Sequence, residues 1–302
     1  MMKNKILITG GAGFIGNELI RLFRNKKDIV VVDKKKNKKI ISRFKELNIK
    51  YIQGDLTNKK FSRKIYKHAK IIFHLAGNVK VPSTDVNLDL KKEKKIYNEA
   101  IIIMKNLISF SQKKARIVFP STHLVFENCK KNKSYFNEKS KPLPNLAYSK
   151  SKYDCEKILQ RNKIDYVILR LGSVYGKTTD KKRMFNLPNL FALRAKNGLN
   201  LKLFSGGVQI KGIISVKDVA RAMFFLKKKN YSKQIYNLVS EHHTVKKIGL
   251  ICKKYNKKIN LLLTKHKIPY EGYYMNCSKI KKTGFYFKYK YENFAKEFIK
   301  NS

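Results

Sequence analysis

The sequence of 302 residues has few cysteines, and their spacing is irregular. The four are Cys129, Cys155, Cys252 and Cys277, and no two of them form a C-x-x-C pair. Zinc sites and disulfide frameworks both require closer and more regular spacing than this. We therefore expect reduced thiols that are mostly structural, and no metal site.

Long apolar runs are also absent. No stretch approaches the roughly 20 residues that a membrane-spanning helix needs. The opening residues, 1–5, lead directly into a short apolar run that stops at Gly10, which is too short for a signal peptide. With 43% hydrophobic and 12% aromatic residues, the chain is too apolar to be disordered. These features predict a cytoplasmic globular protein without membrane insertion.

Acidic residues are scarce. The chain has 20 Asp and Glu against 69 Lys and Arg, a formal charge of +49. The basic clusters recur along the whole sequence, whereas a nucleic-acid site would concentrate them on one element. We interpret them as a lysine-rich solvated surface that attracts anionic substrates, with no specific nucleic-acid partner.

Apolar segments alternate with helical patterns over the first 175 residues. Strands are expected at 5–9, 28–33, 49–53, 70–75, 116–119 and 166–171, and the clearest helices at 91–112 and 147–161. This alternation predicts an α/β fold whose doubly wound parallel sheet is covered on both faces. Beyond Gly176 the rhythm loosens, which suggests a smaller C-terminal lobe. A strand near 234–239 is expected to return to the sheet.

A glycine-rich turn follows the first predicted strand. Gly11, Gly13 and Gly16 form G-x-G-x-x-G where a helix begins, a context that suits a dinucleotide pyrophosphate. Asp33 ends the second strand and can accept a ribose 2′-OH, which favours NAD over NADP. Lys34, Lys35 and Lys36 follow and could instead pair with a 2′-phosphate, so NADP remains the alternative.

Two further strand ends fall at the same predicted edge. Asp55, followed by Leu56, could hold the adenine amine, and Ala76 with Gly77 after Leu75 could admit the cofactor backbone. Plain turns would explain both segments equally well. The expected cofactor residues are Gly10, Gly11, Gly13, Phe14, Ile15, Gly16, Asp33, Asp55, Leu56, Leu75, Ala76, Gly77, Tyr148 and Lys152.

Tyr148 and Lys152 are four residues apart in a predicted helix and so share one face. A free phenol, with a pKa of about 10, is a poor acid or base at neutral pH, but a nearby ammonium lowers that pKa. Lys152 can also donate to the nicotinamide ribose. Ser121 and Thr122 end the fifth strand, where their hydroxyls could bind the substrate oxygen on which Tyr148 acts.

These motifs resemble the extended short-chain dehydrogenase/reductase family, the NAD-dependent epimerase/dehydratase group that modifies nucleotide sugars. The resemblance lies in residues 10–16, 33, 54–56, 74–77, 121–122, 148–152 and 169–176. It implies a Rossmann-type NAD-binding domain at 1–175 and a mainly substrate-binding lobe at 176–302. It also implies a homodimer formed through the helices at 91–112 and 147–161.

The resemblance further implies site residues. Thr122, Tyr148 and Lys152 would be catalytic, with Tyr148 transferring the proton while NAD carries a hydride from a sugar carbon. Lys211 falls where relatives usually carry an arginine on the nucleotide diphosphate, and a second such arginine is missing near 265–267. The expected substrate-binding residues are Ser121, Thr122, His123, Ser173 and Lys211.

Dehydratases of the family carry an Asp-Glu pair directly after the threonine, but here those positions are His123 and Leu124. Dehydration is therefore not expected, and His123 is either a proton relay or a structural histidine. A nucleotide-sugar epimerase is the preferred interpretation. An NAD(P)H-dependent keto-sugar reductase resembling dTDP-4-dehydrorhamnose reductases is the alternative, because the segment 121–126 ends in Val-Phe. A non-catalytic basic scaffold is the third possibility.

Overall fold

The computed structural model describes residues 5–35, 38–77, 90–129, 135–178, 181–264 and 272–300. It separates into two compact units. The first consists of Met1–Val125, Pro144–Arg170 and Ala220–Tyr236, and the second of Phe126–Leu143, Leu171–Val219 and Asn237–Ser302. The chain thus passes between the two units several times, and each is described below by itself.

A seven-stranded sheet organises the first unit, with the order β11-β7-β5-β4-β1-β2-β3. Its strands are β1 (Lys5–Thr9), β2 (Ile29–Asp33), β3 (Lys50–Gln53), β4 (Ala69–His74), β5 (Arg116–Thr122), β7 (Asp165–Leu171) and β11 (Gln234–Leu238). The pairs β1–β2, β1–β4, β2–β3 and β4–β5 run parallel. The expected doubly wound parallel sheet is confirmed, and β11 joins it near the expected residues.

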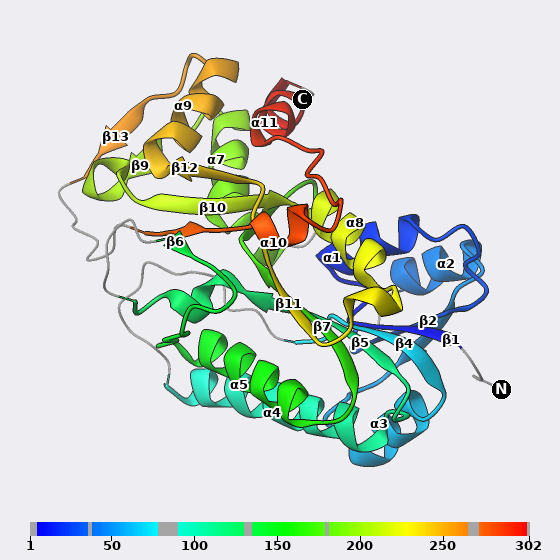
Figure 1. Ribbon diagram of the computed structural model, residues 1–302. Helices are drawn as coiled ribbons and strands as arrows, with labels where there is room; N and C mark the ends of the chain where they lie inside the picture. The colour runs from blue at the N-terminus through cyan, green and yellow to red at the C-terminus, as the bar shows by residue number, and fades with distance from the viewer. Residues whose placement is uncertain are drawn as a thin grey trace. The chain divides into compact units, whose positions relative to one another are not determined.

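Helices cover both faces of this sheet (Figure 1). They are α1 (Phe14–Arg21), α2 (Lys38–Glu46), α3 (Lys59–Tyr66), α4 (Leu90–Phe110), α5 (Ala147–Arg161) and α8 (Val216–Leu226). On the α3–α4–α5 side, Leu7, Ile72 and Ile117 pack with Met104 and Leu159 in one buried core. Side chains alternate along a strand, so the other face presents Ile8, Val31 and Phe73.

The order of the strands creates a switch point at β1, where an open α/β sheet can bind a ligand. β1 lies between β2 and β4, so the chain winds in opposite directions on its two sides. Open α/β sheets bind ligands beyond the carboxyl ends of their strands at such a switch point. The segments after β1, β2 and β4 therefore meet at one edge.

The second unit contains three small sheets, ordered β12-β10-β8, β13-β9 and β14-β6. The strands are β6 (Tyr135–Phe136), β8 (Ser173–Tyr175), β9 (Leu201–Leu203), β10 (Ile210–Ser215), β12 (Glu241–Thr244), β13 (Leu261–Leu263) and β14 (Tyr274–Met275). The helices are α6 (Lys181–Met184), α7 (Leu187–Lys196), α9 (Val245–Tyr255), α10 (Ser278–Lys281) and α11 (Tyr291–Lys300). A second core joins α7, α9 and α11 around Tyr175, Ile248 and Tyr291.

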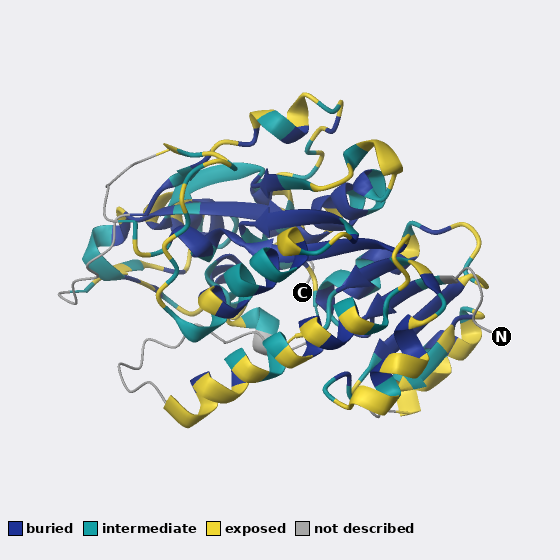
Figure 2. Ribbon diagram, turned by 60° about the horizontal axis from the view of Figure 1, so that its bottom comes forward, coloured by how far each residue is buried: buried dark blue, intermediate teal, exposed yellow. Residues whose placement is uncertain are grey.

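Buried residues concentrate on the strands, and exposed residues on helices and loops (Figure 2). Within the described ranges, no helix is both long and apolar enough to cross a membrane. All four cysteines are free, and three of them are buried.

Candidate active site

The glycine-rich turn joins β1 to α1 with very little space. Gly10 has a φ of +66°, and a Cβ there would lie 2.7 Å from the backbone nitrogen of Ala76. A Cβ on Gly16 would lie 2.5 Å from the carbonyl oxygen of Gly11, so only glycine lets α1 approach the turn. α1 starts after Gly13 without a side-chain cap, and its first turn has no acidic residue. The positive helix end, which includes Phe14 and Ile15, fits an anionic pyrophosphate.

Asp33 lies beside this turn. Its Oδ2 accepts a hydrogen bond from the backbone nitrogen of Ala12 at 3.1 Å, and its Oδ1 accepts from the backbone nitrogen of Lys35 at 3.1 Å. The end of β2 and the glycine-rich turn are therefore connected through this carboxylate. A carboxylate held by backbone donors next to a pyrophosphate site fits the hydroxyls of a bound ribose.

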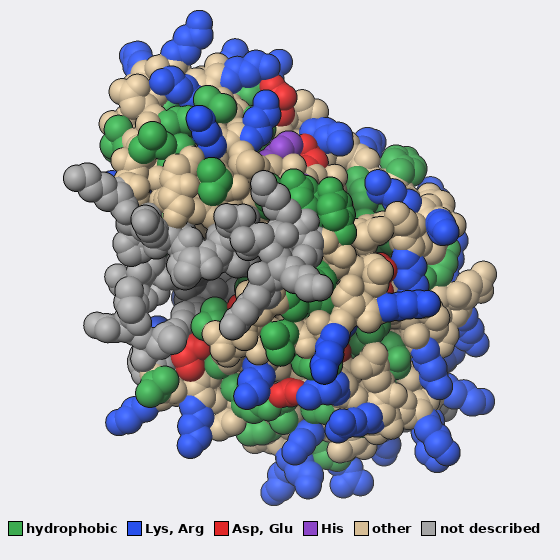
Figure 3. Space-filling view, turned by 60° about the vertical axis from the view of Figure 1, so that its left-hand side comes forward, with side chains coloured by type: hydrophobic (Ala, Val, Ile, Leu, Met, Phe, Trp, Pro, Cys, Tyr) green, Lys and Arg blue, Asp and Glu red, His purple; other side chains and the backbone are tan. Residues whose placement is uncertain are grey.

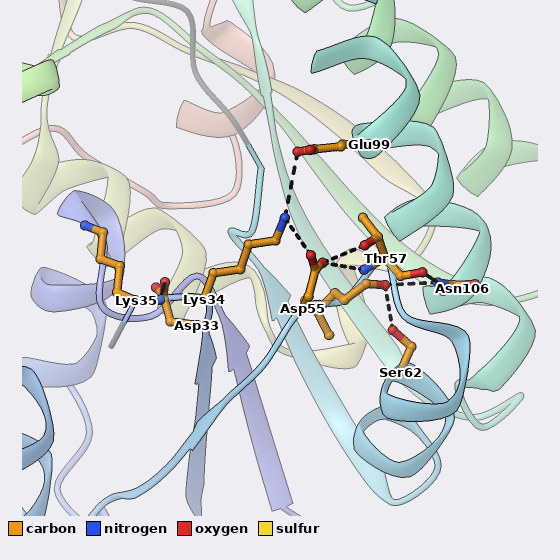
Figure 4. A network of polar contacts seen from close by, with 9 residues as sticks. Asp33, Lys34, Lys35, Asp55, Thr57, Ser62, Glu99 and Asn106 are labelled. Carbon is orange, nitrogen blue, oxygen red and sulfur yellow. Dashed lines mark hydrogen bonds and ion pairs between the residues drawn. The ribbon is translucent and has the colours of Figure 1, made fainter. Parts of the chain in front are cut away.

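Asp55 belongs to a polar network after β3 (Figure 4). Its Oδ1 accepts from the backbone nitrogen and the hydroxyl of Thr57, both at 2.8 Å, and its Oδ2 lies 3.0 Å from Nζ of Lys34. Partial burial by itself would raise the pKa of Asp55, but the Thr57 bonds and the Lys34 ammonium hold it below its usual value. The side chain of Leu56 is buried in the core.

The segment after β4 is fixed by Thr9, which the sequence analysis did not single out. Its hydroxyl lies 2.9 Å from Nδ1 of His74 and accepts from the backbone nitrogen of Ala76 at 3.3 Å. The backbone nitrogen of Leu75 donates to the carbonyl oxygen of Thr9. Burial, and secondly the ammonium of Lys152, lowers the pKa of His74 to about 3. A neutral histidine thus supports the turn that leads to Gly77.

The end of β5 carries Thr122, which is buried. The sequence pattern ends this strand at Phe119, but the structure continues it through Thr122. The Oγ1 of Thr122 accepts from the backbone nitrogen of Leu124 at 3.2 Å, so the hydroxyl can still donate its proton. His123 is buried and begins the short 3-10 helix His123–Phe126.

α5 carries the other two predicted catalytic residues, and one of them, Lys152, contacts the end of β5. Tyr148 and Lys152 are both half-buried and lie one turn apart. Nζ of Lys152 donates to the carbonyl oxygen of Pro120 at 2.9 Å and lies 4.6 Å from the centre of the Phe119 ring. The ammonium is therefore anchored two residues before Thr122.

A buried polar network, which was not predicted from the sequence, connects the end of β5 to α5 and β7. The hydroxyl of Ser121 donates to Oε1 of Glu156, a side chain with no exposed area. Arg170 of β7 binds the same carboxylate, with its Nη2 lying 2.8 Å from Oε2. Glu156 follows Lys152 by one helical turn, and this spacing was the only available signal. Ser121 is thus directed towards the interior network.

Ser173 and Lys211 belong to the second unit. In the β8–β10 pair Ser173 lies opposite Ile213, and in the β10–β12 pair Lys211 lies opposite His243. Both residues are half-buried. Burial lowers the pKa of the Lys211 ammonium. Residue 36, a possible contact for a 2′-phosphate, and residues 265–267, where a second diphosphate arginine is missing, lie outside the described residues.

Among the described residues, no group of three or more His, Cys, Asp and Glu side chains is arranged so that it could hold a metal ion. The chemical groups that the described part of the site does offer are hydroxyls, lysine ammonium groups, backbone groups, the imidazole of His123 and the carboxylates of Asp33 and Asp55.

The chain is similar in sequence and in fold to several known enzymes that act on nucleotide sugars. A putative UDP-glucose 4-epimerase of Methanocaldococcus jannaschii is 27% identical over 245 residues, which cover 77% of this chain and 76% of the relative. A dTDP-D-glucose 4,6-dehydratase of Dictyostelium discoideum is 27% identical over 259 residues, covering 78% of this chain and 58% of the relative. The UDP-glucose 4-epimerase of Thermus thermophilus in complex with NAD has a similar fold, with a TM-score of 0.80, 20% identity and coverage of 98% and 97%.

Residues 6–238 match the NAD dependent epimerase/dehydratase family, a range that includes the glycine-rich turn, Asp33 and the residues at the end of β5 and on α5. The sequence-based identification of the family and of an extended short-chain dehydrogenase/reductase enzyme is confirmed. The chain belongs to the NAD dependent epimerase/dehydratase family.

Proposed function

We propose that this enzyme is an NAD-dependent nucleotide-sugar epimerase. The observation that carries the proposal is the end of β5, where Lys152 is bonded to Pro120 close to Thr122. This contact supports a role of Lys152 beside Thr122, and the two residues after Thr122 are His123 and Leu124 and not a pair of carboxylates. Residues that can act on one sugar hydroxyl are therefore present, whereas the Asp-Glu pair that water elimination is expected to need does not follow Thr122.

Tyr148, Thr122 and Lys152 each have a distinct part in the proposed reaction. Oη of Tyr148 takes the proton of the sugar hydroxyl and later returns it. Thr122 donates a hydrogen bond to the same oxygen and orients it. The Lys152 ammonium stabilises the phenolate and donates to the cofactor ribose. When bound, NAD supplies reversible hydride acceptance at the sugar carbon.

The preference for NAD over NADP rests on Asp33. Its carboxylate is fixed by two backbone donors, from Ala12 and Lys35, and can accept a ribose hydroxyl. A 2′-phosphate at that position would meet a like charge. The other proposed cofactor contacts are Gly10, Gly11, Gly13, Phe14, Ile15 and Gly16 for the pyrophosphate, Asp55 with Leu56 for the adenine, Leu75, Ala76 and Gly77 for the close approach of the cofactor, and Tyr148 with Lys152.

The substrate class is a nucleotide-diphosphate sugar. The ammonium of Lys211 supplies a point charge for the diphosphate, without the two-pronged geometry of an arginine. Ser121, His123 and Ser173 remain proposed substrate contacts, although the Ser121 proton is directed to Glu156, so this hydroxyl would accept from the sugar. Three further predictions remain. They are the division into domains at residues 1–175 and 176–302, the homodimer, and the cytoplasmic location. Size-exclusion chromatography tests the homodimer.

The proposal is tested by purifying the protein without added cofactor, denaturing it and identifying the released nucleotides by mass spectrometry. An epimerase regenerates its cofactor in each cycle, so we expect bound NAD and interconversion of a nucleotide sugar. Oxidation of NAD(P)H only when a keto sugar is supplied would replace the proposal with a reductase. Failure to bind either cofactor would overturn the catalytic interpretation.

A further inference from the structure

Lys34, the residue after the proposed ribose-binding carboxylate, is turned towards acidic side chains (Figure 4). Its Nζ lies 3.0 Å from Oδ2 of Asp55 and 3.8 Å from Oε2 of Glu99, a residue of α4. Lys35 extends to the opposite side of Asp33 in the same view. The lysine that directly follows Asp33 in the sequence is thus paired within the protein.

The Lys34 ammonium lies between two acidic side chains, although acidic residues are scarce in this chain. Asp55 and Glu99 place two carboxylates within 3.8 Å of the Lys34 ammonium, a formal charge of −1 for these three groups. The whole chain carries +49 and has only 20 acidic residues. Two of these scarce acids therefore pair with the lysine that directly follows the proposed ribose-binding residue Asp33.

We propose that Asp55 and Glu99 are specificity-determining residues, which pair with Lys34 and so deny its charge to a 2′-phosphate, making the site select NAD over NADP. The inference rests on the proposed function, because it requires a dinucleotide whose ribose lies at Asp33. A 2′-phosphate brings between one and two negative charges at neutral pH. The two carboxylates both repel that charge and neutralise the cation nearest to it.

The pairing is suited to a test because it contributes little to folding. The side chains of Lys34 and Asp55 are 49% and 46% exposed, and ion pairs with such exposure are weak. Removing one charge should therefore leave the protein folded. The low pKa of Asp55 keeps its carboxylate charged under ordinary assay conditions.

The experiment measures the dissociation constants of NAD and NADP by calorimetry at low salt. The variants are Asp55→Asn, Glu99→Gln and the two combined, with Asp28→Asn, beyond the opposite end of β2, as the charge-matched control. In the combined variant we expect the ratio of the NADP constant to the NAD constant to fall roughly three- to tenfold. Adding Lys34→Met to the combined variant should reverse most of that fall, and Asp28→Asn should leave the ratio unchanged.

Using the ratio separates this inference from the proposed function. A loss of adenine contact in Asp55→Asn would weaken both dinucleotides equally and would not move the ratio. If the combined variant binds NAD but the ratio stays at the wild-type value, the inference is wrong and the proposed function stands. If Lys34→Met alone weakens NADP strongly, Lys34 already contacts the phosphate, which also overturns the inference. If the wild type binds neither dinucleotide, the proposed function itself fails.

Discussion

At the scale of single residues, tyrosines in this chain differ in whether their hydroxyls can exchange a proton. Burial raises the pKa of Tyr66, Tyr175 and Tyr291, whose rings lie in the two hydrophobic cores. Those phenols remain protonated at neutral pH. Tyr148 is instead half-buried and lies one turn before the anchored ammonium of Lys152.

Replacing Tyr148 by Phe removes only the phenolic oxygen. We expect kcat to fall by about 10²- to 10⁴-fold, because general acid-base catalysis is lost, while the NAD dissociation constant changes little. Tyr153→Phe is the matched control, since Tyr153 lies on the same helix and is also half-buried. Steady-state kinetics and calorimetry measure both quantities. Wild-type kcat in Tyr148→Phe would remove this residue from the mechanism.

The lowered pKa of His74 makes the free energy of unfolding depend on pH. Its pKa is about 3 in the folded protein, against an ordinary value of 6.5, so the unfolded chain binds a proton that the folded chain does not. The stabilising contribution is intact above pH 6.5 and is lost as the pH falls towards 3. At pH 5 the loss amounts to about 2 kcal/mol.

The variant His74→Asn should therefore lose about 2 kcal/mol less of its unfolding free energy between pH 7 and pH 5 than the wild type does. Urea unfolding followed by circular dichroism at the two pH values measures this difference. The same substitution at the half-buried His68, His68→Asn, is measured in parallel as the control. His242, whose pKa burial lowers to about 4, leaves part of the slope in all variants. An unchanged slope in His74→Asn would show that another group is responsible.

At the scale of elements, local pattern predicted much of the fold. The glycine-rich turn could be predicted because its sequence fixes both backbone conformation and close packing, and the expected helix at 147–161 matches α5. The last three residues of β5, 120–122, were not predicted as strand because they do not continue the apolar run. Contacts from α5 fix them instead, with Lys152 bonded to Pro120 and Glu156 bonded to Ser121. α11 was missed, although Tyr291, Ala295 and Ile299 recur every four residues and are buried.

The contact between Glu156 and Arg170 could not be predicted in the same way, because it joins a helix to a strand through a buried ion pair. Sequence spacing does not show which basic residue faces a given acid in a chain with 69 of them. Figure 4 illustrates the same difficulty, since Lys34 pairs with residues of two other segments. Elements follow from local pattern, whereas their polar contacts depend on the tertiary fold.

Glu156→Gln leaves Arg170 buried without its counter-charge. We expect the free energy of unfolding to fall by about 3–5 kcal/mol, as for other broken buried ion pairs. Because the chain has no tryptophan, urea unfolding is followed by circular dichroism. Glu297→Gln is the control, since its ion pair with Lys177 is exposed and should contribute nothing measurable. Equal stability of the two variants would contradict the structural importance of the buried network.

At the scale of the whole molecule, the charge of +49 is widely distributed. On the face drawn in Figure 3, Lys and Arg side chains are spread over the surface, with few acidic groups between them. Such a field attracts anions from many directions and does not define one binding surface. This distribution supports an influence on substrate approach more than a specific nucleic-acid site.

The last prediction concerns that influence. Raising NaCl from about 50 to 500 mM shortens the Debye length from roughly 14 to 4 Å and screens the field. We expect kcat/KM for the proposed nucleotide-sugar substrate to fall by about tenfold because association slows, while kcat changes little. Sucrose at equal osmolality is the control for water activity. An equal fall in kcat would place the salt effect on the catalytic groups, and no effect at all would mean that the positive surface contributes nothing to substrate capture.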